Sequence, residues 1–261
     1  MPIPGKDDIV SGVILHHQDA GSGPPVLFVH AGVCDSRMWR RQLVELAEDH
    51  YILAPDLRGF GQSPLTSEAY SDAGDLLTLL DHLGLEEISL VGASSGGQVA
   101  LELVSCAPTR VSQLLLLSAT ADGVDPTPSL EEFAAEENAL IDAGDIDGAT
   151  ELNVRTWLGP EADDAARSQV RLMQRNAFAV QLAAGEDIND EHVTVDLSSV
   201  DVPTQVISGL HDLDFFLLVA RYLTSTLPNA RLVELPWAGH LPSLERPVET
   251  MSLIRDWLGS R

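Results

Sequence analysis

The sequence contains only two cysteines, Cys34 and Cys106, and their separation matches neither a metal-binding nor a redox motif. We expect both to act as small hydrophobic residues, and we expect no metal site. No hydrophobic run is long enough to cross a bilayer as a helix, so no membrane segment is expected. The first ten residues lack the apolar core of a signal peptide, which makes the cytoplasm the expected location.

Positive charge is also scarce. The 261 residues include 15 Lys and Arg against 40 Asp and Glu, which gives a formal net charge of −25 at pH 7. Such a charge argues against binding to nucleic acid or to an anionic membrane surface, so a small molecule is the expected partner. A chain of this length with 44% hydrophobic residues is sufficient for one large α/β domain with a substantial core.

Short apolar runs alternate with helical patterns along most of the chain. The runs predict strands at residues 9–17, 26–29, 51–54, 88–91, 111–117, 204–208 and 231–235. The helical patterns between and after them fall at residues 36–48, 71–83, 98–106, 215–227 and 247–258. This alternation predicts an α/β fold with a mostly parallel central sheet that carries helices on both faces.

The alternation stops between residues 119 and 200, where the pattern is mostly helical. Helices are expected at about 129–143, 147–157 and 161–183, the first opened by a capping box from Ser129 to Glu132. We therefore expect a helical cap subdomain at 119–200, inserted into a core formed by residues 1–118 and 201–261. Such an insertion is expected to cover the functional site.

The stretch Gly92-Ala93-Ser94-Ser95-Gly96 has the pattern G-x-S-x-G between a predicted strand and a predicted helix. This is the context of a nucleophile elbow, in which a strained turn lifts the serine hydroxyl above the strand. Ser94 is the preferred nucleophile because glycine stands at both required positions. Ser95 is the alternative in a frame shifted by one residue. With Ser94 as nucleophile, the backbone N–H of Ser95 begins a helix and can face an oxyanion.

A serine hydroxyl needs a base, and the base needs an orienting carboxylate. His240 follows the strand at 231–235 and is the preferred base. Asp212 follows the strand at 204–208 and is the preferred acid, with Asp214 as runner-up and Asp122 as a third candidate. The resulting chain order of serine, aspartate and histidine is that of the α/β hydrolases. A second oxyanion donor is expected after the strand at 26–29, and the N–H of Gly32 fits.

These stretches resemble the α/β-hydrolase superfamily over essentially the full length of the chain. The most similar members are small capped enzymes such as 3-oxoadipate enol-lactonases, carboxylesterases and meta-cleavage-product hydrolases. The matching segments are VLFVHAGVCDSRMW, PDLRGFGQS, LVGASSGG, SGLHDLD and PWAGHLPSLERP. The resemblance implies Ser94, Asp212 and His240 as a catalytic triad, with Gly32 and Ser95 as oxyanion donors.

Two positions depart from the family pattern. Ala31 replaces the glycine that usually follows the histidine at position 30, which leaves Gly32 at the donor position. Ser95 replaces the methionine or glutamine often found after the nucleophile, where only the backbone is needed. In the family, Asp56 and Arg58 shape the loop after their strand, and we expect the same structural role here.

The predicted function is that of a serine hydrolase that cleaves a carboxylic ester or lactone through an acyl-enzyme, without a metal or organic cofactor. A carbon–carbon bond hydrolase and a cofactor-free haloperoxidase or perhydrolase use the same triad and remain alternatives. A small-molecule receptor with vestigial activity is a third. Candidates for the substrate pocket are Val33, Phe133, Trp157, Leu158, Phe178 and Leu241.

Overall fold

The protein is described from a computed structural model, which covers residues 13–185 and 190–259. Its centre is a seven-stranded sheet with the strand order β1-β3-β2-β4-β5-β6-β7. The strands are β1 (His17–Gly21), β2 (Pro25–Val29), β3 (Tyr51–Pro55), β4 (Ile88–Ala93), β5 (Val111–Leu117), β6 (Thr204–Gly209) and β7 (Ala230–Leu235). All neighbouring pairs are parallel except β1 and β3. The predicted α/β class with a mostly parallel sheet is confirmed.

The central strands are apolar on both faces because both faces are covered. Every residue of β4 is buried, and β5 and β6 are buried almost throughout. A parallel sheet with helices on both sides has this pattern, whereas a half-exposed sheet alternates polar and apolar residues. Phe28 of β2 packs on Trp39 with ring centroids 5.0 Å apart, and both are fully buried.

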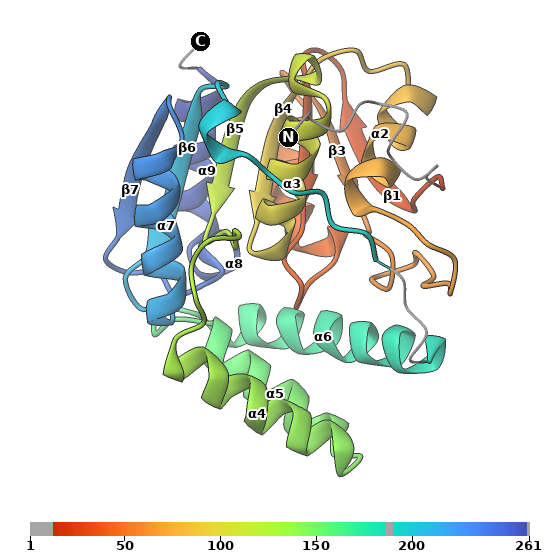
Figure 1. Ribbon diagram of the computed structural model, residues 1–261, viewed down its shortest axis with the longest axis vertical. Coiled ribbons are helices and arrows are strands. Elements are labelled where there is room, and N and C mark those ends of the chain that lie inside the picture. The colour runs from red at the N-terminus through yellow and green to blue at the C-terminus, as the bar shows by residue number, and fades with distance from the viewer. Residues whose placement is uncertain (1–12, 186–189, 260–261) are drawn as a thin grey trace.

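Outside the segment between β5 and β6, helices connect most successive strands or follow the last one. They are α1 (Arg40–Glu45), α2 (Asp72–His82), α3 (Ser95–Cys106), α7 (Asp214–Thr226), α8 (Pro242–Glu245) and α9 (Pro247–Leu258). In Figure 1, α3 and α7 lie in front of the sheet and α9 lies behind it. In the part of the chain that the structure describes, short 3-10 helices span Ser36–Trp39, Pro108–Arg110 and Leu197–Ser199. Among the described residues, no helix is long and apolar enough to cross a membrane.

Three further helices lie between β5 and β6: α4 (Pro128–Asp142), α5 (Ile146–Trp157) and α6 (Asp164–Ala184). Figure 1 shows them beneath the sheet, beyond the end at which β5 leads into α4. Gln169 and Gln181 on α6 donate hydrogen bonds to the carbonyls of Arg37 and Gly59, in loops that follow β2 and β3. Helix α6 therefore contacts the segments that follow the carboxyl ends of β2 and β3.

Two of these helices begin at aspartates that cap them. Asp145 accepts a hydrogen bond from the N–H of Gly148 at 2.9 Å, and Asp163 accepts one from Ala166 at 2.8 Å. The capping box expected at Ser129 is wrong, because α4 begins one residue earlier with Thr127 as its N-cap and no side-chain cap bond. Pro128 at the first helical position has no backbone N–H, so it needs no acceptor there.

The first strand also differs from the prediction. It spans His17–Gly21, whereas the apolar pattern placed it at 9–17. Residues 13–16 are not in a strand, and residues 9–12 lie outside the described chain. The first ten residues, considered above for a signal peptide, and residues 186–189 of the expected cap also lie outside it. β1 is an antiparallel edge strand whose position is set by pairing with β3, from His17 opposite Pro55 to Gly21 opposite Tyr51.

Candidate active site

Ser94 stands at the junction between β4 and α3. Its backbone has φ 54° and ψ −122°, a conformation that residues other than glycine rarely adopt. Glycines make the sharp turn sterically possible. A Cβ on Gly92 would overlap the carbonyl oxygen of Gly96, and a Cβ on Gly96 would overlap that of His30. Ser95 is instead the first residue of α3, so the geometry of an elbow belongs to the frame centred on Ser94.

His240 lies in the loop between β7 and α8 and contacts Asp212, which follows β6. The distance from His240 Nδ1 to Asp212 Oδ2 is 2.7 Å, and both side chains are almost completely buried. The carboxylate also accepts a hydrogen bond from the N–H of Leu213 at 2.8 Å. Because the carboxylate accepts a hydrogen bond from Nδ1–H, this contact leaves Nε2 of the imidazole as the nitrogen available for proton transfer.

The two other candidate acids lie elsewhere. Asp214 is the first residue of α7, where its Oδ1 accepts hydrogen bonds from the hydroxyls of Thr127 at 2.7 Å and Ser129 at 2.5 Å. It therefore links the start of α4 to α7. Asp122 is exposed in the loop after β5. Of the three carboxylates considered from the sequence, the structure brings Asp212 to the imidazole of His240.

Ser94 and His240 line one cavity of about 350 Å³. No hydrogen bond joins their side chains in the described part of the chain. Nucleophile–base contacts are commonly long in proteins without a bound substrate and shorten in the reacting complex. Two aromatic rings flank the imidazole: the centroid of Phe216 is 4.2 Å from it and that of Trp157 is 4.7 Å. These rings shield His240 from water and restrict its orientation.

The loop after β2 brings Gly32 beside Ser95. A Cβ on Gly32 would lie 3.1 Å from Ser95 Oγ, and both residues line the same cavity as Ser94. The N–H of the preceding residue, Ala31, already donates to the sulfur of Met38 at 3.4 Å. Gly32 and Ser95, the two residues expected to donate to an oxyanion, therefore lie beside each other at the cavity that Ser94 lines.

A buried histidine fixes the shape of this loop. His30 Nε2 accepts a hydrogen bond from the N–H of Leu57 at 2.9 Å, and its Nδ1 lies 2.9 Å from the carbonyl oxygen of Ala31. Nδ1 must therefore carry the proton, so the ring is neutral. Burial lowers the pKa of His30, which agrees with this assignment. Since both ring nitrogens are occupied within the loops, His30 serves as a structural link between β2 and the loop after β3.

The expected structural roles of Asp56 and Arg58 are confirmed. Asp56 accepts backbone hydrogen bonds from Ser36 at 2.8 Å and Gln62 at 2.9 Å. Arg58 pairs with Asp75 through two hydrogen bonds of 2.5 and 3.0 Å, and both side chains are almost fully buried. These contacts tie the loop after β3 to its neighbours.

Sequence reasoning missed Glu245, which holds the loop that carries His240. Its carboxylate accepts hydrogen bonds from the N–H groups of Gly239 at 2.8 Å and Leu241 at 3.0 Å, on either side of the histidine. Gly159, at the end of α5, donates a further backbone hydrogen bond to it. Burial raises the pKa of Glu245 and these hydrogen bonds oppose the rise. In the sequence, the only feature that could have indicated this role is the single acidic residue in the segment PSLERP.

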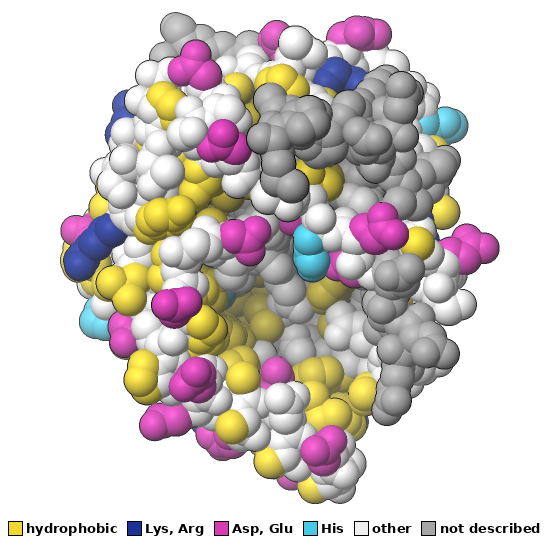
Figure 2. Space-filling view, in the orientation of Figure 1, with side chains coloured by type: hydrophobic (Ala, Val, Ile, Leu, Met, Phe, Trp, Pro, Cys, Tyr) yellow, Lys and Arg dark blue, Asp and Glu magenta, His cyan; other side chains and the backbone are white. Residues whose placement is uncertain are grey.

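Four residues predicted for the substrate pocket line the cavity around Ser94: Val33, Phe133, Trp157 and Phe178. Leu158 and Leu241 are instead packed into the hydrophobic core and line neither of the two cavities described here. Phe215 and Phe216 of α7 also line the cavity and were not expected from the sequence. Figure 2 shows a hollow with hydrophobic side chains between the body of the molecule and the helices below it.

Polar side chains from the three inserted helices also reach this cavity. Asn153 accepts a hydrogen bond from Trp157 Nε1 at 2.7 Å and contacts Glu137 through its amide nitrogen. Gln174 Oε1 is buried without a hydrogen-bond partner. An unpaired amide oxygen in an otherwise apolar cavity is suited to accept a hydrogen bond from a substrate.

A second cavity, of about 430 Å³, adjoins the first. The two share Gly32, Phe60, Ser95, Thr120 and Gln181 as lining residues. Asp72 of α2 and Asp190 and His192 of the segment after residue 189 line the second cavity, and Glu102 of α3 contacts His192. Within residues 13–185 and 190–259, no three His, Cys, Asp or Glu side chains are grouped as ligands for a metal ion.

Comparison with known proteins agrees with this geometry. The chain is 30% identical over 259 residues to the putative carbamate hydrolase RutD of Pseudomonas savastanoi pv. phaseolicola. The aligned region covers 94% of this chain and 96% of that protein. The chain is 27% identical to the 2-hydroxymuconate semialdehyde hydrolase of Pseudomonas sp. strain CF600, over 97% and 93% of the two chains. A thermophilic esterase from Thermogutta terrifontis superposes with a TM-score of 0.79 at 28% identity, over 94% and 92% of the chains.

The family comparison covers most of the chain. The model of the alpha/beta hydrolase fold matches residues 24–247, a span that includes the elbow, both oxyanion candidates, Asp212 and His240. The match and the relatives together show that the chain belongs to the α/β-hydrolase family and is a hydrolase.

Proposed function

We propose that the protein hydrolyses a carboxylic ester or lactone through an acyl-enzyme, with Ser94 as nucleophile, His240 as base and Asp212 as the orienting acid. The observation that carries the proposal is the buried 2.7 Å contact between His240 and Asp212, in the same cavity as the strained Ser94. An esterase from Thermogutta terrifontis among the structural neighbours supports the ester class.

In the first half-reaction, Ser94 Oγ attacks the carbonyl carbon while His240 Nε2 takes its proton. The carbonyl π electrons move to oxygen, and the N–H groups of Gly32 and Ser95 stabilise the resulting oxyanion. The oxyanion then collapses, the bond to the leaving oxygen breaks, and His240 returns the proton to that oxygen. Asp212 stabilises the imidazolium during this exchange without itself taking the proton.

In the second half-reaction, a water molecule replaces the alcohol. His240 removes a proton from the water, whose oxygen attacks the acyl carbon and regenerates a tetrahedral oxyanion. The bond to Ser94 Oγ breaks, His240 protonates that oxygen, and the carboxylic acid leaves. Phe216 and Trp157 exclude bulk water from one side of the imidazole, which strengthens its interaction with Asp212.

We also propose that residues 119–200 form a cap subdomain on a core of residues 1–118 and 201–261. Phe133, Trp157 and Phe178 come from α4, α5 and α6 respectively, so each helix supplies an aromatic wall to the cavity. In this assignment the core supplies the reacting groups and the cap selects the acyl or alcohol group by its shape.

The test is hydrolysis of p-nitrophenyl esters of increasing acyl length and of simple lactones by the wild-type protein and by Ser94→Ala. The wild type should turn over at least one ester, and Ser94→Ala should lose activity by on the order of 10⁴-fold or more. Asp212→Asn should lose a similar factor because the imidazole adopts the wrong tautomer. Asp214→Asn is the matched control and should stay within about twofold of the wild type.

A carbon–carbon bond hydrolase is the second candidate, supported by the 2-hydroxymuconate semialdehyde hydrolase among the relatives. The same assay separates it, since a vinylogous diketone substrate is consumed with loss of its long-wavelength absorbance. Absence of turnover on all esters and lactones, together with turnover of such a dienone, would overturn the ester proposal and retain the triad. An unchanged rate in Ser94→Ala would overturn both.

A further inference from the structure

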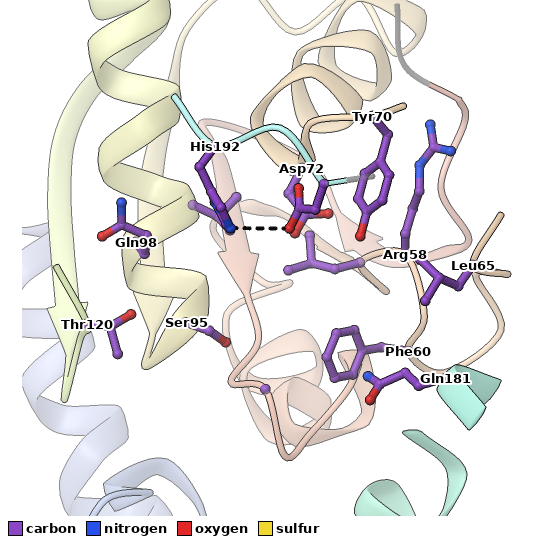
Figure 3. A pocket seen from close by; sticks show the side chains of 14 residues that line it. Arg58, Phe60, Leu65, Tyr70, Asp72, Ser95, Gln98, Thr120, Gln181 and His192 are labelled. Carbon is purple, nitrogen blue, oxygen red and sulfur yellow. Dashed lines mark ion pairs between the residues drawn. The ribbon is translucent and has the colours of Figure 1, made fainter. Parts of the chain in front are cut away.

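The cavity of about 430 Å³ beside the proposed nucleophile has an acidic end. Figure 3 shows Asp72 and Tyr70 toward one end of it and Ser95 and Thr120 toward the other. Because Ser95 and Gly32 line both cavities, a substrate held at Ser94 can extend into this second space. A group bound at the acidic end would therefore belong to a molecule whose carbonyl reacts at Ser94.

The positive charge of Arg58 is already used within the protein. Its guanidinium makes two hydrogen bonds to Asp75 and lies 4.6 Å from the centroid of the Tyr70 ring. It also donates to the hydroxyl of Thr66 at 3.3 Å. Since Asp75 neutralises this arginine, Arg58 leaves the neighbouring carboxylates without a full partner charge.

Three further carboxylates converge here with one imidazole between them. His192 lies 3.3 Å from Glu102 and 3.5 Å from Asp190, and its side chain is 67% exposed. Glu102, by contrast, is almost fully buried and also accepts a hydrogen bond from Gln98 at 3.1 Å. A single exposed histidine can neutralise at most one of the two carboxylates that it contacts.

Asp72 has no such partner. Its Oδ1 is sealed from solvent and accepts no hydrogen bond from any described residue. A buried carboxylate without a donor is destabilised, so the residue is suited to a donor or cation that is supplied from outside the chain. The ionisable groups that act on Asp72 come from four segments: Asp75 on its own helix, Glu102 on α3, Asp190, and Arg58 and Tyr70 on the loop between β3 and α2.

We propose that this cavity binds an alkylammonium group of the substrate, with Asp72 and Asp190 as its counter-charges. The assignment rests on the proposed function, because it concerns a second subsite for the molecule that reacts at Ser94. Phe60, Tyr70, Leu57 and Leu65 provide aromatic and aliphatic walls that suit the methyl groups of a tertiary or quaternary ammonium. The absence of a three-ligand group among the described residues disfavours a metal ion as the occupant.

The protonation of Asp72 gives the proposal a second readout. Burial raises the pKa of Asp72 to about 8, and the carboxylates of Asp190, Asp75 and Glu102 add to the rise. An ammonium group favours the ionised form, so the cation and the proton compete for the same carboxylate. Binding of a cationic substrate should therefore strengthen as pH rises toward and above 8, while binding of a neutral isostere should not.

The experiment compares esters that differ by one atom: choline esters against 3,3-dimethylbutyl esters, in which carbon replaces the ammonium nitrogen. A second pair carries the cation on the acyl side, as p-nitrophenyl 4-(trimethylammonio)butyrate against p-nitrophenyl 5,5-dimethylhexanoate. In at least one pair, the wild type should favour the cationic ester in kcat/KM by about tenfold or more. Asp72→Asn should remove most of this preference while retaining activity on the neutral ester.

The control is Asp142→Asn, which makes the same substitution at an exposed position at the end of α4. It should leave the ratio of cationic to neutral kcat/KM unchanged, which separates the local contact from the overall negative charge. A wild-type preference for the neutral ester in both pairs would overturn the proposal. So would a preference that Asp72→Asn does not reduce.

A binding measurement separates this proposal from the proposed reaction. If the protein hydrolyses no ester, calorimetric titration with choline and with 3,3-dimethylbutan-1-ol still tests the subsite. Binding of choline alone, lost in Asp72→Asn and in Asp190→Asn, would support the subsite without the ester reaction. Ester hydrolysis with no choline binding and no cationic preference would retain the reaction and reject the subsite. Should Asp72→Asn fail to fold, Asp190→Asn supplies the same comparison.

Discussion

Single residues in the candidate site are held in conformations that the protein must stabilise elsewhere. Ser94 has a positive φ without being glycine, and residues in such conformations cost on the order of 1–3 kcal/mol. The buried strand β4 before it and the helix α3 after it fix this geometry, because neither can shift without disturbing the core. Asp72 is held in an unfavourable state of another kind, because burial opposes its ionisation and its Oδ1 has no hydrogen-bond partner among the described residues.

Asp72 should make folding stability dependent on pH. Its pKa is about 8 in the folded protein against about 3.9 for an unperturbed aspartate, so between these values the folded state retains a proton that the unfolded state releases. Stability contributed by the neutral carboxyl is therefore full below about pH 4 and is lost as pH rises toward 8. Asp72→Asn should accordingly gain at least about 1 kcal/mol in unfolding free energy relative to wild type at pH 8.

The measurement is urea denaturation of both proteins at pH 5 and pH 8. The difference in unfolding free energy between variant and wild type should be larger at pH 8. A difference that is equal at the two pH values, or larger at pH 5, would show that Asp72 ionises normally.

Residues that follow a local motif could be predicted from the sequence, whereas those that depend on convergence of distant segments could not. Ser94 is flanked by glycines within five residues, and His240 and Asp212 each follow an apolar run. Their catalytic roles remain predictions. Asp72 and Asp190 are 118 positions apart and come together only because residue 190 pairs with Tyr70. No periodicity or spacing in the sequence indicates that contact.

Among the elements, α8 and the loop before it form one unit through Glu245. Its carboxylate joins the N–H groups of Gly239 and Leu241 and reaches Gly159 at the end of α5. Three segments, two of the core and one of the insertion, therefore meet at a single buried side chain. The orientation of His240 depends on this unit, since the histidine lies between the two anchored residues.

Glu245→Ala should lower kcat by about tenfold or more with little change in KM, because the loop that holds His240 loses both anchors. It should also lower the unfolding free energy by about 1–3 kcal/mol, since the buried N–H groups of Gly239, Leu241 and Gly159 are left unpaired. Glu245→Gln, which keeps an acceptor, should recover part of kcat. These values are obtained from ester kinetics and urea denaturation of the same preparations.

Glu249→Ala on α9 is the matched control, because Glu249 is about half exposed and pairs with Arg246 at the surface at 3.6 Å. It should change stability by no more than about 0.5 kcal/mol and leave kcat unaltered. Equal losses in kcat for the two alanine variants would remove the positioning role assigned to Glu245.

The strands of the core and the edge strand β7 were predicted better than the edge strand β1. The runs at 88–91 and 111–117 are apolar because both faces of these strands are covered, and the observed β4 and β5 contain them. β1 has the sequence HQDAG and lies at the edge, so its residues carry no comparable pattern. The expected helix at 36–48 is divided into a 3-10 turn and α1, a change in hydrogen bonding that hydrophobic spacing does not report.

The whole molecule carries a formal charge of −25, and acidic side chains outnumber basic ones on the face in Figure 2. Mutual repulsion of these charges disfavours the compact state, and a dissolved salt screens it. The same field attracts cations toward the molecule, which would assist the encounter with an ammonium substrate at low ionic strength.

Raising NaCl from about 10 mM to 300 mM should therefore raise the melting temperature by about 2–5 °C. KCl at the same ionic strength should have an equal effect if screening is the cause. A melting temperature that stays constant or falls between the two salt concentrations would show that repulsion does not limit stability. Thermal unfolding followed by circular dichroism provides the measurement.

Trp157 belongs to the insertion, yet its ring packs 4.7 Å from the imidazole of His240. Modular exchange of α4–α6 between relatives would thus transplant part of the environment of the proton-transfer group together with the pocket walls. A chimera that takes α4–α6 from one relative and the loop between β7 and α8 from another would bring together two contact surfaces that did not evolve together. Because Trp157 and His240 are in contact, α4–α6 and the loop between β7 and α8 should be exchanged together when the substrate range is engineered.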